Sequence, residues 1–270
     1  MKRHLLIDIT CYLTAFLLIQ TGVYIASTLL CKALSLPQSA TLTVAASTLS
    51  SLLTIVVFAW RKWASVRGGI TGGTLLLAML WAALLALGCT HPMTWLLETC
   101  HLEMPAALQQ QFTAIMQHDL GYVCIGLLVP IAEELVFRGA ILRRLLEAMG
   151  HGKRWIAIAV TALLFGIVHG NMAQGVNATL TGLLLGWMYV RTGSLLPCMA
   201  FHWTNNTIAY LAFRLMPGAA DMSLNDLYGG DSRRVGLAIL FSLMIAVGAA
   251  YQIHAITAHK GTADHGKSAS

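Results

Sequence analysis

Runs of apolar residues alternate with short polar stretches along almost the whole chain. Eight such runs can be drawn, at approximately residues 5–30, 40–60, 73–90, 120–147, 155–170, 174–192, 195–215 and 235–256. Each is close to the ~20 residues that a helix needs to cross the hydrocarbon core of a bilayer. The pattern therefore predicts an all-α, polytopic integral membrane protein with about eight transmembrane helices.

The stretches outside these runs divide the chain into four parts. The first run is too long for the apolar part of a signal peptide, so we expect an uncleaved first helix. Residues 91–118 are compatible with a helix on the membrane surface and equally with a loop. We expect three helices and this outer stretch at 1–119, a catalytic core of helices four to seven at 120–215, an outer loop and the eighth helix at 216–258, and a disordered tail at 259–270.

Composition and charge agree with a membrane protein. Of the 270 residues, 57% are hydrophobic and only 10% are charged, whereas soluble domains carry roughly 25% charged residues. The net charge of +6 does not indicate a nucleic-acid partner, because the basic residues lie in short loops between apolar runs. With the N-terminus inside, twelve Lys and Arg residues fall on the inner side and four on the outer side. The positive-inside rule then predicts a cell-membrane protein with both termini in the cytoplasm.

Three charged residues interrupt the fourth run, at Glu133, Glu134 and Arg138. Each costs about 2.5–3.5 kcal/mol at the centre of a membrane helix, so these groups should face the bundle interior and have a role there. Glu134 and Arg138 are four residues apart and can pair on one helix face. Glu133 points about 100° away from Glu134. A purely structural polar cluster accounts for the pair but leaves Glu133 without a partner on its own helix.

Two later runs contribute further polar groups. His169 lies near the end of the fifth run, and His202 and Asn206 lie four residues apart on one face of the seventh. Taken singly, a buried histidine or asparagine more often packs or bridges helices. Together with Glu133 they are the groups that water activation and oxyanion stabilisation require. No serine or cysteine lies in these motifs, which argues against covalent catalysis.

The sequence leaves the need for a metal open. Glu133, His169 and His202 form a two-histidine, one-carboxylate set, which is a known pattern for catalytic zinc. The His-Glu-x-x-His spacing of many zinc proteases is missing. The six cysteines are scattered and have no metal-type spacing. Both a zinc site and a metal-free mechanism are compatible with these residues.

The motifs Glu133-Glu134-x-x-x-Arg138, Phe165-x-x-x-His169 and His202-x-x-x-Asn206 resemble the signature of a known family. This is the type II CAAX prenyl endopeptidase and bacteriocin-processing (CPBP, or Abi) family of intramembrane proteases. The resemblance covers about residues 129–210. It implies an eight-helix endopeptidase in which Glu133 and His169 activate water, while His202 and Asn206 form the oxyanion hole. Members are often described as metalloproteases, and a metal-free glutamate mechanism is also proposed.

The resemblance implies a membrane-associated peptide or protein as substrate, but not whether that substrate is prenylated. Two other functions remain in view. Glu133, His169 and His202 can relay protons in a transporter, or the motifs can be retained in a non-catalytic immunity or scaffold protein. Asn206 and the Glu134–Arg138 pair add nothing to a proton relay, and repeated halves of the kind many transporters show are not evident. The endopeptidase is therefore the leading hypothesis.

Overall fold

The computed structural model describes residues 2–35, 39–66, 68–216, 218 and 222–258, without the side chains of residues 2, 3 and 151. These residues form helices and connecting turns, and no strand occurs among them. The all-α class is therefore confirmed. The tail predicted at 259–270 lies outside the described residues.

Every one of the predicted apolar runs is helical. The long elements are α1 (Lys2–Ala33), α2 (Ala40–Trp60), α3 (Gly72–Thr99), α7 (Arg154–Ile167), α8 (Met172–Thr192), α9 (Leu196–Leu215) and α11 (Ser232–Ala258). The fourth run is a continuous helix made of η1 (Tyr122–Leu128), α5 (Val129–Glu134), η2 (Leu135–Leu142) and α6 (Arg143–Met149). Short elements are α4 (Ala106–Gln117), η3 (His151–Lys153) and α10 (Leu224–Leu227).

Fewer helices than eight have the length and composition of a membrane span. Among the described residues, α1, α2, α3 and α11 are long and apolar enough to cross a bilayer. A fifth candidate combines α4 with the helix at residues 122–149, and these two are bent by 102° at their junction. α7 is apolar but has only 14 residues. The helical segments thus agree with the prediction, whereas the number of eight spans is not confirmed.

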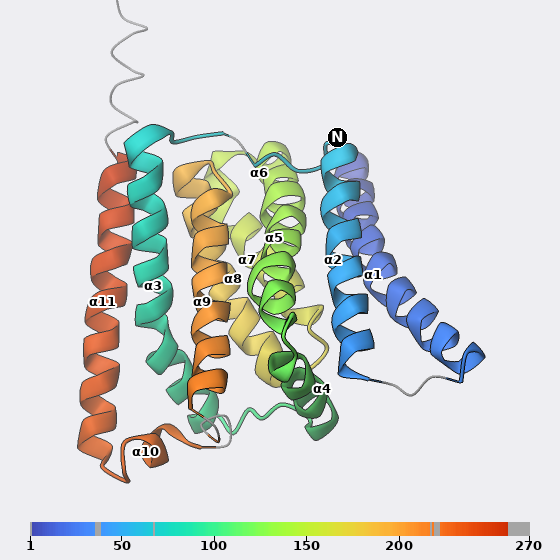
Figure 1. The fold of residues 1–270 in the computed structure, drawn as a ribbon. Helices are drawn as coiled ribbons and strands as arrows, with labels where there is room; N and C mark the ends of the chain where they lie inside the picture. Colours follow the sequence, from blue (N-terminus) through green and yellow to red (C-terminus); the bar gives the residue numbers. More distant parts are fainter. Residues whose placement is uncertain (1, 36–38, 67, 217, 219–221, 259–270) are drawn as a thin grey trace, which may run out of the picture.

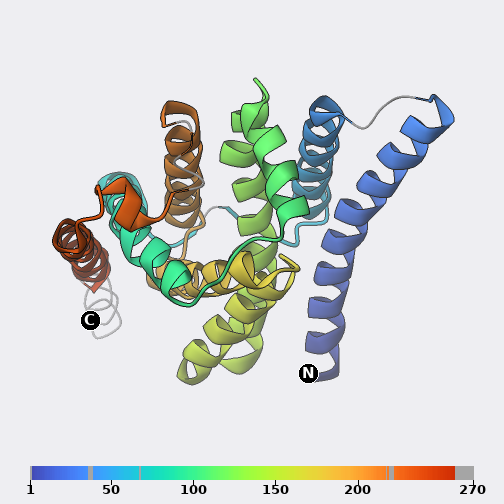
Figure 2. The same cartoon turned by 90° about the horizontal axis from the view of Figure 1, so that it is seen from below.

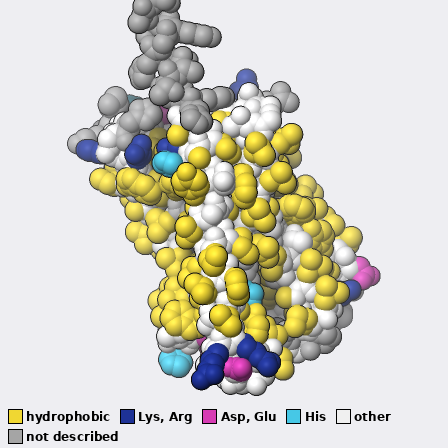
Figure 3. All heavy atoms as spheres, turned by 90° about the vertical axis from the view of Figure 1, so that its left-hand side faces the viewer, with side chains coloured by type: hydrophobic (Ala, Val, Ile, Leu, Met, Phe, Trp, Pro, Cys, Tyr) yellow, Lys and Arg dark blue, Asp and Glu magenta, His cyan; other side chains and the backbone are white. Residues whose placement is uncertain are grey.

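The helices form one bundle, and its middle is covered by apolar side chains. α3 packs against α11 and α9, α7 packs against α8, and α1 packs against α2 at the far side of the molecule (Figure 1). The helix at residues 122–149 runs between α9 and α2. Figure 3 shows the face formed by α3 and α11, where hydrophobic side chains cover the middle and charged side chains gather at both ends. This distribution fits an integral membrane protein.

Aromatic packing holds the central helix against α1, α2 and α7. The Phe137 ring lies 5.7 Å from Phe16 of α1 and 4.9 Å from Phe165 of α7. Tyr12 of α1 contacts Phe58 of α2 at 6.3 Å. These contacts involve the N-terminal half of α1. The C-terminal half diverges from α2, as both ribbon views show (Figures 1 and 2).

The central helix departs from regular α-helical geometry on both sides of α5. η1 and η2 are π-helical. Segments of this kind are rare and occur frequently at functional sites. Glu133 and Glu134 are the last residues of the short α-helical piece between them. The two carboxylates therefore sit where the helical register changes.

Candidate active site

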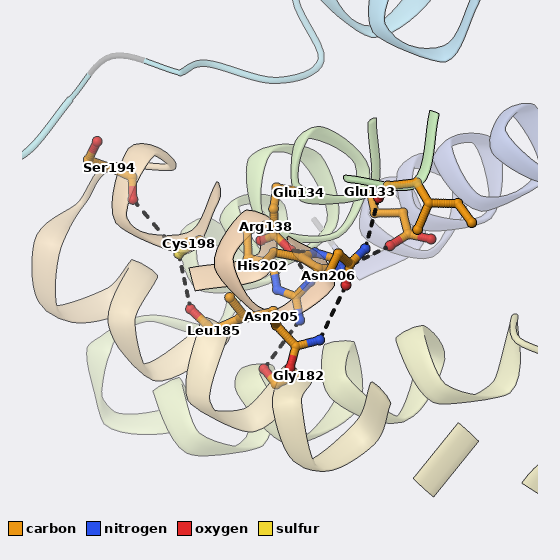
Figure 4. Close-up of polar contacts among 11 residues, drawn as sticks. Glu133, Glu134, Arg138, Gly182, Leu185, Ser194, Cys198, His202, Asn205 and Asn206 are labelled. Carbon is orange, nitrogen blue, oxygen red and sulfur yellow. Dashed lines mark hydrogen bonds and ion pairs between the residues drawn. The ribbon is translucent and has the colours of Figure 1, made fainter. Parts of the chain in front are cut away.

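A wholly buried ion pair anchors the central helix to its neighbours. Arg138 Nη1 donates to Glu134 Oε1 at 2.9 Å, and neither side chain is exposed. Arg138 Nη2 also donates to the Gly182 carbonyl of α8 at 3.4 Å (Figure 4). The guanidinium lies 4.5 Å from the centre of the Phe165 ring. A Cβ at Gly182 would lie 3.0 Å from Ala162 Cα. The small residue thus lets α8 approach α7 close to the arginine.

His202 of α9 spans the two neighbouring carboxylates. Its Nδ1 lies 3.0 Å from Glu134 Oε1. Because an ionised carboxylate only accepts hydrogen bonds, Nδ1 is the donor. The other ring nitrogen, Nε2, lies 3.6 Å from Glu133 Oε2. The Glu133 side chain is 15% exposed and that of Glu134 is fully buried, so Glu133 is the carboxylate that a substrate can reach.

Glu133 and His169 line one pocket of about 350 Å³, enclosed by α1, α2, α5 and the end of α7. His169 lies just beyond the last residue of α7. Its Nδ1 is 2.7 Å from the Phe165 carbonyl oxygen. A carbonyl cannot donate, so Nδ1 carries the proton and Nε2 is the ring nitrogen left for a water molecule. The first and second motifs therefore share this pocket.

Asn206 is placed differently. It is one turn beyond His202 on α9, and its Nδ2 donates to the Ile125 carbonyl of η1 at 3.0 Å. Its Oδ1 accepts a hydrogen bond of 3.2 Å from Asn205. Among the described residues that line the Glu133 pocket, neither His202 nor Asn206 is present. One amide hydrogen of Asn206 is used by η1, and the second is left for another acceptor.

The zinc ligands suggested by the sequence do not form a metal site in the described part of the chain. No three His, Cys, Asp or Glu side chains there are grouped as metal ligands. The Phe165 ring instead packs edge-on against both histidine rings, 5.1 Å from His169 and 6.0 Å from His202. Glu133, His169 and His202 therefore do not fit a tetrahedral zinc ion as they stand.

Sequence reasoning missed the part that the first two helices play. Gln20 of α1 and Ser47 and Ser51 of α2 line the same pocket as Glu133. The signal was present as Ser47, Ser50, Ser51 and Thr54, which return every three to four residues within an otherwise apolar run. Such a spacing places hydroxyls on one helix face.

One family matches part of the chain. Residues 119–208 match the model of the family described as type II CAAX prenyl endopeptidase Rce1-like. Neither the curated proteins nor the solved structures contain a match to the chain. The matched segment includes Glu133, Glu134, Arg138, His169, His202 and Asn206, and it leaves α1 to α3 and α11 outside. Over residues 119–208 the chain is thus similar to the Rce1-like type II CAAX prenyl endopeptidase family, a family of membrane-embedded proteases.

Proposed function

We propose that this protein is an intramembrane endopeptidase that hydrolyses a peptide bond of a membrane-associated peptide or protein with an activated water molecule. The observation that carries the proposal is the position of Glu133. Its carboxylate is held from one side by a buried polar cluster and lines, with His169, a pocket between four helices. A base beside a pocket large enough for water and a peptide group is what direct hydrolysis requires.

In the proposed reaction, Glu133 takes a proton from a water molecule while the water oxygen bonds to the carbon of the peptide carbonyl. His169 Nε2 accepts a hydrogen bond from the second O–H of that water and so orients it, and this hydrogen stays on the oxygen. The carbon–nitrogen bond of the tetrahedral intermediate then breaks, and Glu133 returns its proton to the leaving nitrogen. The products are a carboxylic acid and an amine, and the enzyme carboxylate is regenerated.

His202 and Asn206 have supporting roles in this proposal. The contact of His202 Nε2 with Glu133 Oε2 at 3.6 Å limits the rotation of the base. Asn206 lies outside the lining of the Glu133 pocket, and in this proposal its second amide hydrogen reaches the oxyanion when the substrate is bound. One such donor is typically worth about 2.7–4 kcal/mol. The Glu134–Arg138 pair fixes the helix that carries the base.

We further infer that both termini face the cytoplasm, in the cell membrane. The described ends of the chain, at Lys2 and Ala258, lie at the same end of the bundle (Figure 1). The loops at that end, between α2 and α3 and between α6 and α7, carry Arg61, Lys62, Lys153 and Arg154. Basic loops on one side of a membrane bundle support a cytoplasmic location for that side.

The proposal is tested with detergent-purified protein and a library of quenched fluorescent decapeptides with apolar centres. We expect cleavage by the wild type and a loss of about 10²–10⁴-fold in rate for Glu133→Gln, as removal of a general base causes. Glu147→Gln is the matched control, because Glu147 lies on α6 and is 46% exposed. We expect a chelator to leave the rate unchanged. Proton flux through proteoliposomes without any cleavage would instead favour the transporter.

A further inference from the structure

The pocket beside Glu133 has an uncharged polar wall that no catalytic role explains. Gln20 on α1 and Ser47 and Ser51 on α2 contribute to its lining. These residues lie outside the segment that matches the protease family. Among the described lining residues, Glu133 and His169 are the ionisable ones. Any ligand bound by the wall is therefore recognised through neutral hydrogen bonds.

Ser51 indicates that this wall is made for a ligand. The residue is only 1% exposed, and within the described part of the chain its hydroxyl has no hydrogen-bond partner. The neighbouring Ser50 hydroxyl differs, because it is bonded to Gln20 and to the Ser47 carbonyl. Among the described residues, the side-chain atoms that are both fully closed off and without a partner are Glu134 Oε2 and Arg138 Nε. The Ser51 hydroxyl is therefore not sealed within the bundle, and it can gain a hydrogen bond from a molecule in the pocket. Its position at the pocket is explained if a bound molecule supplies the partner.

Gln20 is oriented by α2. The Ser50 hydroxyl lies 2.7 Å from Gln20 Oε1, and Ser50 is only 2% exposed. This contact holds the side-chain amide of α1 against the serine face of α2. The amide nitrogen is then left to donate hydrogen bonds into the pocket. An amide and two hydroxyls together offer both donors and acceptors.

We propose that Gln20, Ser47 and Ser51 bind the main chain of the peptide substrate next to Glu133, which rests on the proposed endopeptidase function. A peptide bond can be attacked only where the substrate is not helical, and there its N–H and C=O groups lose their intrahelical partners. In a bilayer, water cannot replace those partners. Neutral donors and acceptors on α1 and α2 can form hydrogen bonds with the N–H and C=O groups of the extended substrate segment. They do not favour substrates with a charged side chain.

The edge of the pocket suits a substrate that arrives from the lipid. Leu17, which lines the pocket on α1, is 38% exposed, and the following Leu18 is 65% exposed. The C-terminal end of α1 lies apart from α2 (Figure 1). The polar wall therefore begins directly behind an apolar surface that faces the bilayer. A membrane peptide can reach the wall without crossing the bundle.

The test uses a decapeptide selected from the quenched fluorescent library, and it measures binding to the inactive Glu133→Gln protein by fluorescence anisotropy. We expect Ser51→Ala and Gln20→Met each to weaken binding by about 2- to 13-fold, the range for one lost hydrogen bond. In the protein with Glu133 intact, the same changes should raise KM and leave kcat nearly unchanged. Thr54→Val is the control, because this α2 hydroxyl is fully buried and bonds to the Ser50 carbonyl.

A backbone ester in the peptide tests the main-chain contact directly. Replacing one amide near the cleaved bond by an ester removes an N–H and weakens its carbonyl as an acceptor. We expect the ester to weaken binding to the Ser51 protein and to have a much smaller effect on Ser51→Ala. Two results would overturn the proposal. One is that the ester and Ser51→Ala weaken binding independently at every ester position, and the other is that KM is unchanged in both Ser51→Ala and Gln20→Met. The polar wall would then contact only water.

The two proposals fail in different ways. Cleavage by the wild type with unchanged KM in Ser51→Ala and Gln20→Met would remove the binding wall and leave the endopeptidase intact. Binding that depends on Ser51 without any cleavage by the wild type would remove the endopeptidase and keep a peptide-binding wall. A peptide library that neither binds nor is cleaved would overturn both.

Discussion

Glu133 and Glu134 are neighbours in the chain but have different surroundings. Arg138 and His202 both contact the fully buried Glu134 carboxylate. Glu133 is partly exposed to a pocket, and its carboxylate lies 3.6 Å from the other ring nitrogen of His202. An unpaired charge in a medium of low dielectric constant is costly, so Glu134 depends on its partners. We infer that Glu134 contributes to the stability of the fold, whereas Glu133 is the carboxylate that reacts.

The buried pair yields the first prediction. Arg138→Ala leaves Glu134 charged without its strongest partner, and we expect a loss of about 3–5 kcal/mol in stability, measured as thermal unfolding in detergent. Glu134→Gln combined with Arg138→Met removes both charges and should restore part of that loss. Arg154→Ala, at the exposed start of α7, should unfold like the wild type. Equal unfolding temperatures for all of these variants would contradict a structural role for the pair.

Asn206 allows two roles, which one variant separates. As an oxyanion donor, Asn206→Ala should lower kcat by about 10²–10³-fold with little change in KM. As a brace for the Ile125 carbonyl alone, the same change should lower the unfolding temperature and leave kcat nearly intact. We expect the kinetic effect. Asn177→Ala, on α8, is the control for loss of an asparagine in the bundle.

At the scale of helices, the hydrophobic pattern located every long helix but not its internal geometry. Residues 40–60 were predicted as a span and are α2. The fourth run was predicted as one helix and is one, yet its π-helical segments were not predicted, because packing rather than residue preference selects them. The four-residue spacing of Glu134 and Arg138 anticipated their pairing. The serine face of α2 was missed because single serines are common in membrane helices.

The contact between α7 and α8 depends on a glycine. A Cβ at Gly166 would lie 2.5 Å from the Gly175 carbonyl oxygen, which belongs to the backbone and cannot rotate away. We expect Gly166→Ala to cost about 1–3 kcal/mol in stability, as overpacking does. Gly248→Ala on α11 is the matched control, since open space surrounds that position. It should be neutral or slightly stabilising, because alanine is the better helix former.

At the scale of the molecule, charges and chain ends together predict the orientation. Fusions after Ala258 test this in bacterial cells. A fluorescent protein at that position should fold and fluoresce, whereas alkaline phosphatase should be inactive, because it needs an oxidising compartment for its disulfides. The reverse result should appear for fusions in the turn before α11, near Asp231. Active phosphatase at both sites would contradict a crossing of the membrane by α11, which lies between them.

α7 is short for a helix that borders lipid. Its 14 residues span about 21 Å, against about 30 Å for a typical hydrocarbon core. Ile156, Leu163 and Ile167 are more than half exposed on its surface. The bilayer beside α7 must therefore thin, or headgroups and water must descend to the level of His169. Membrane thickness then becomes a control on catalysis: hydrolysis in vesicles should slow as the acyl chains of the phosphatidylcholine are lengthened.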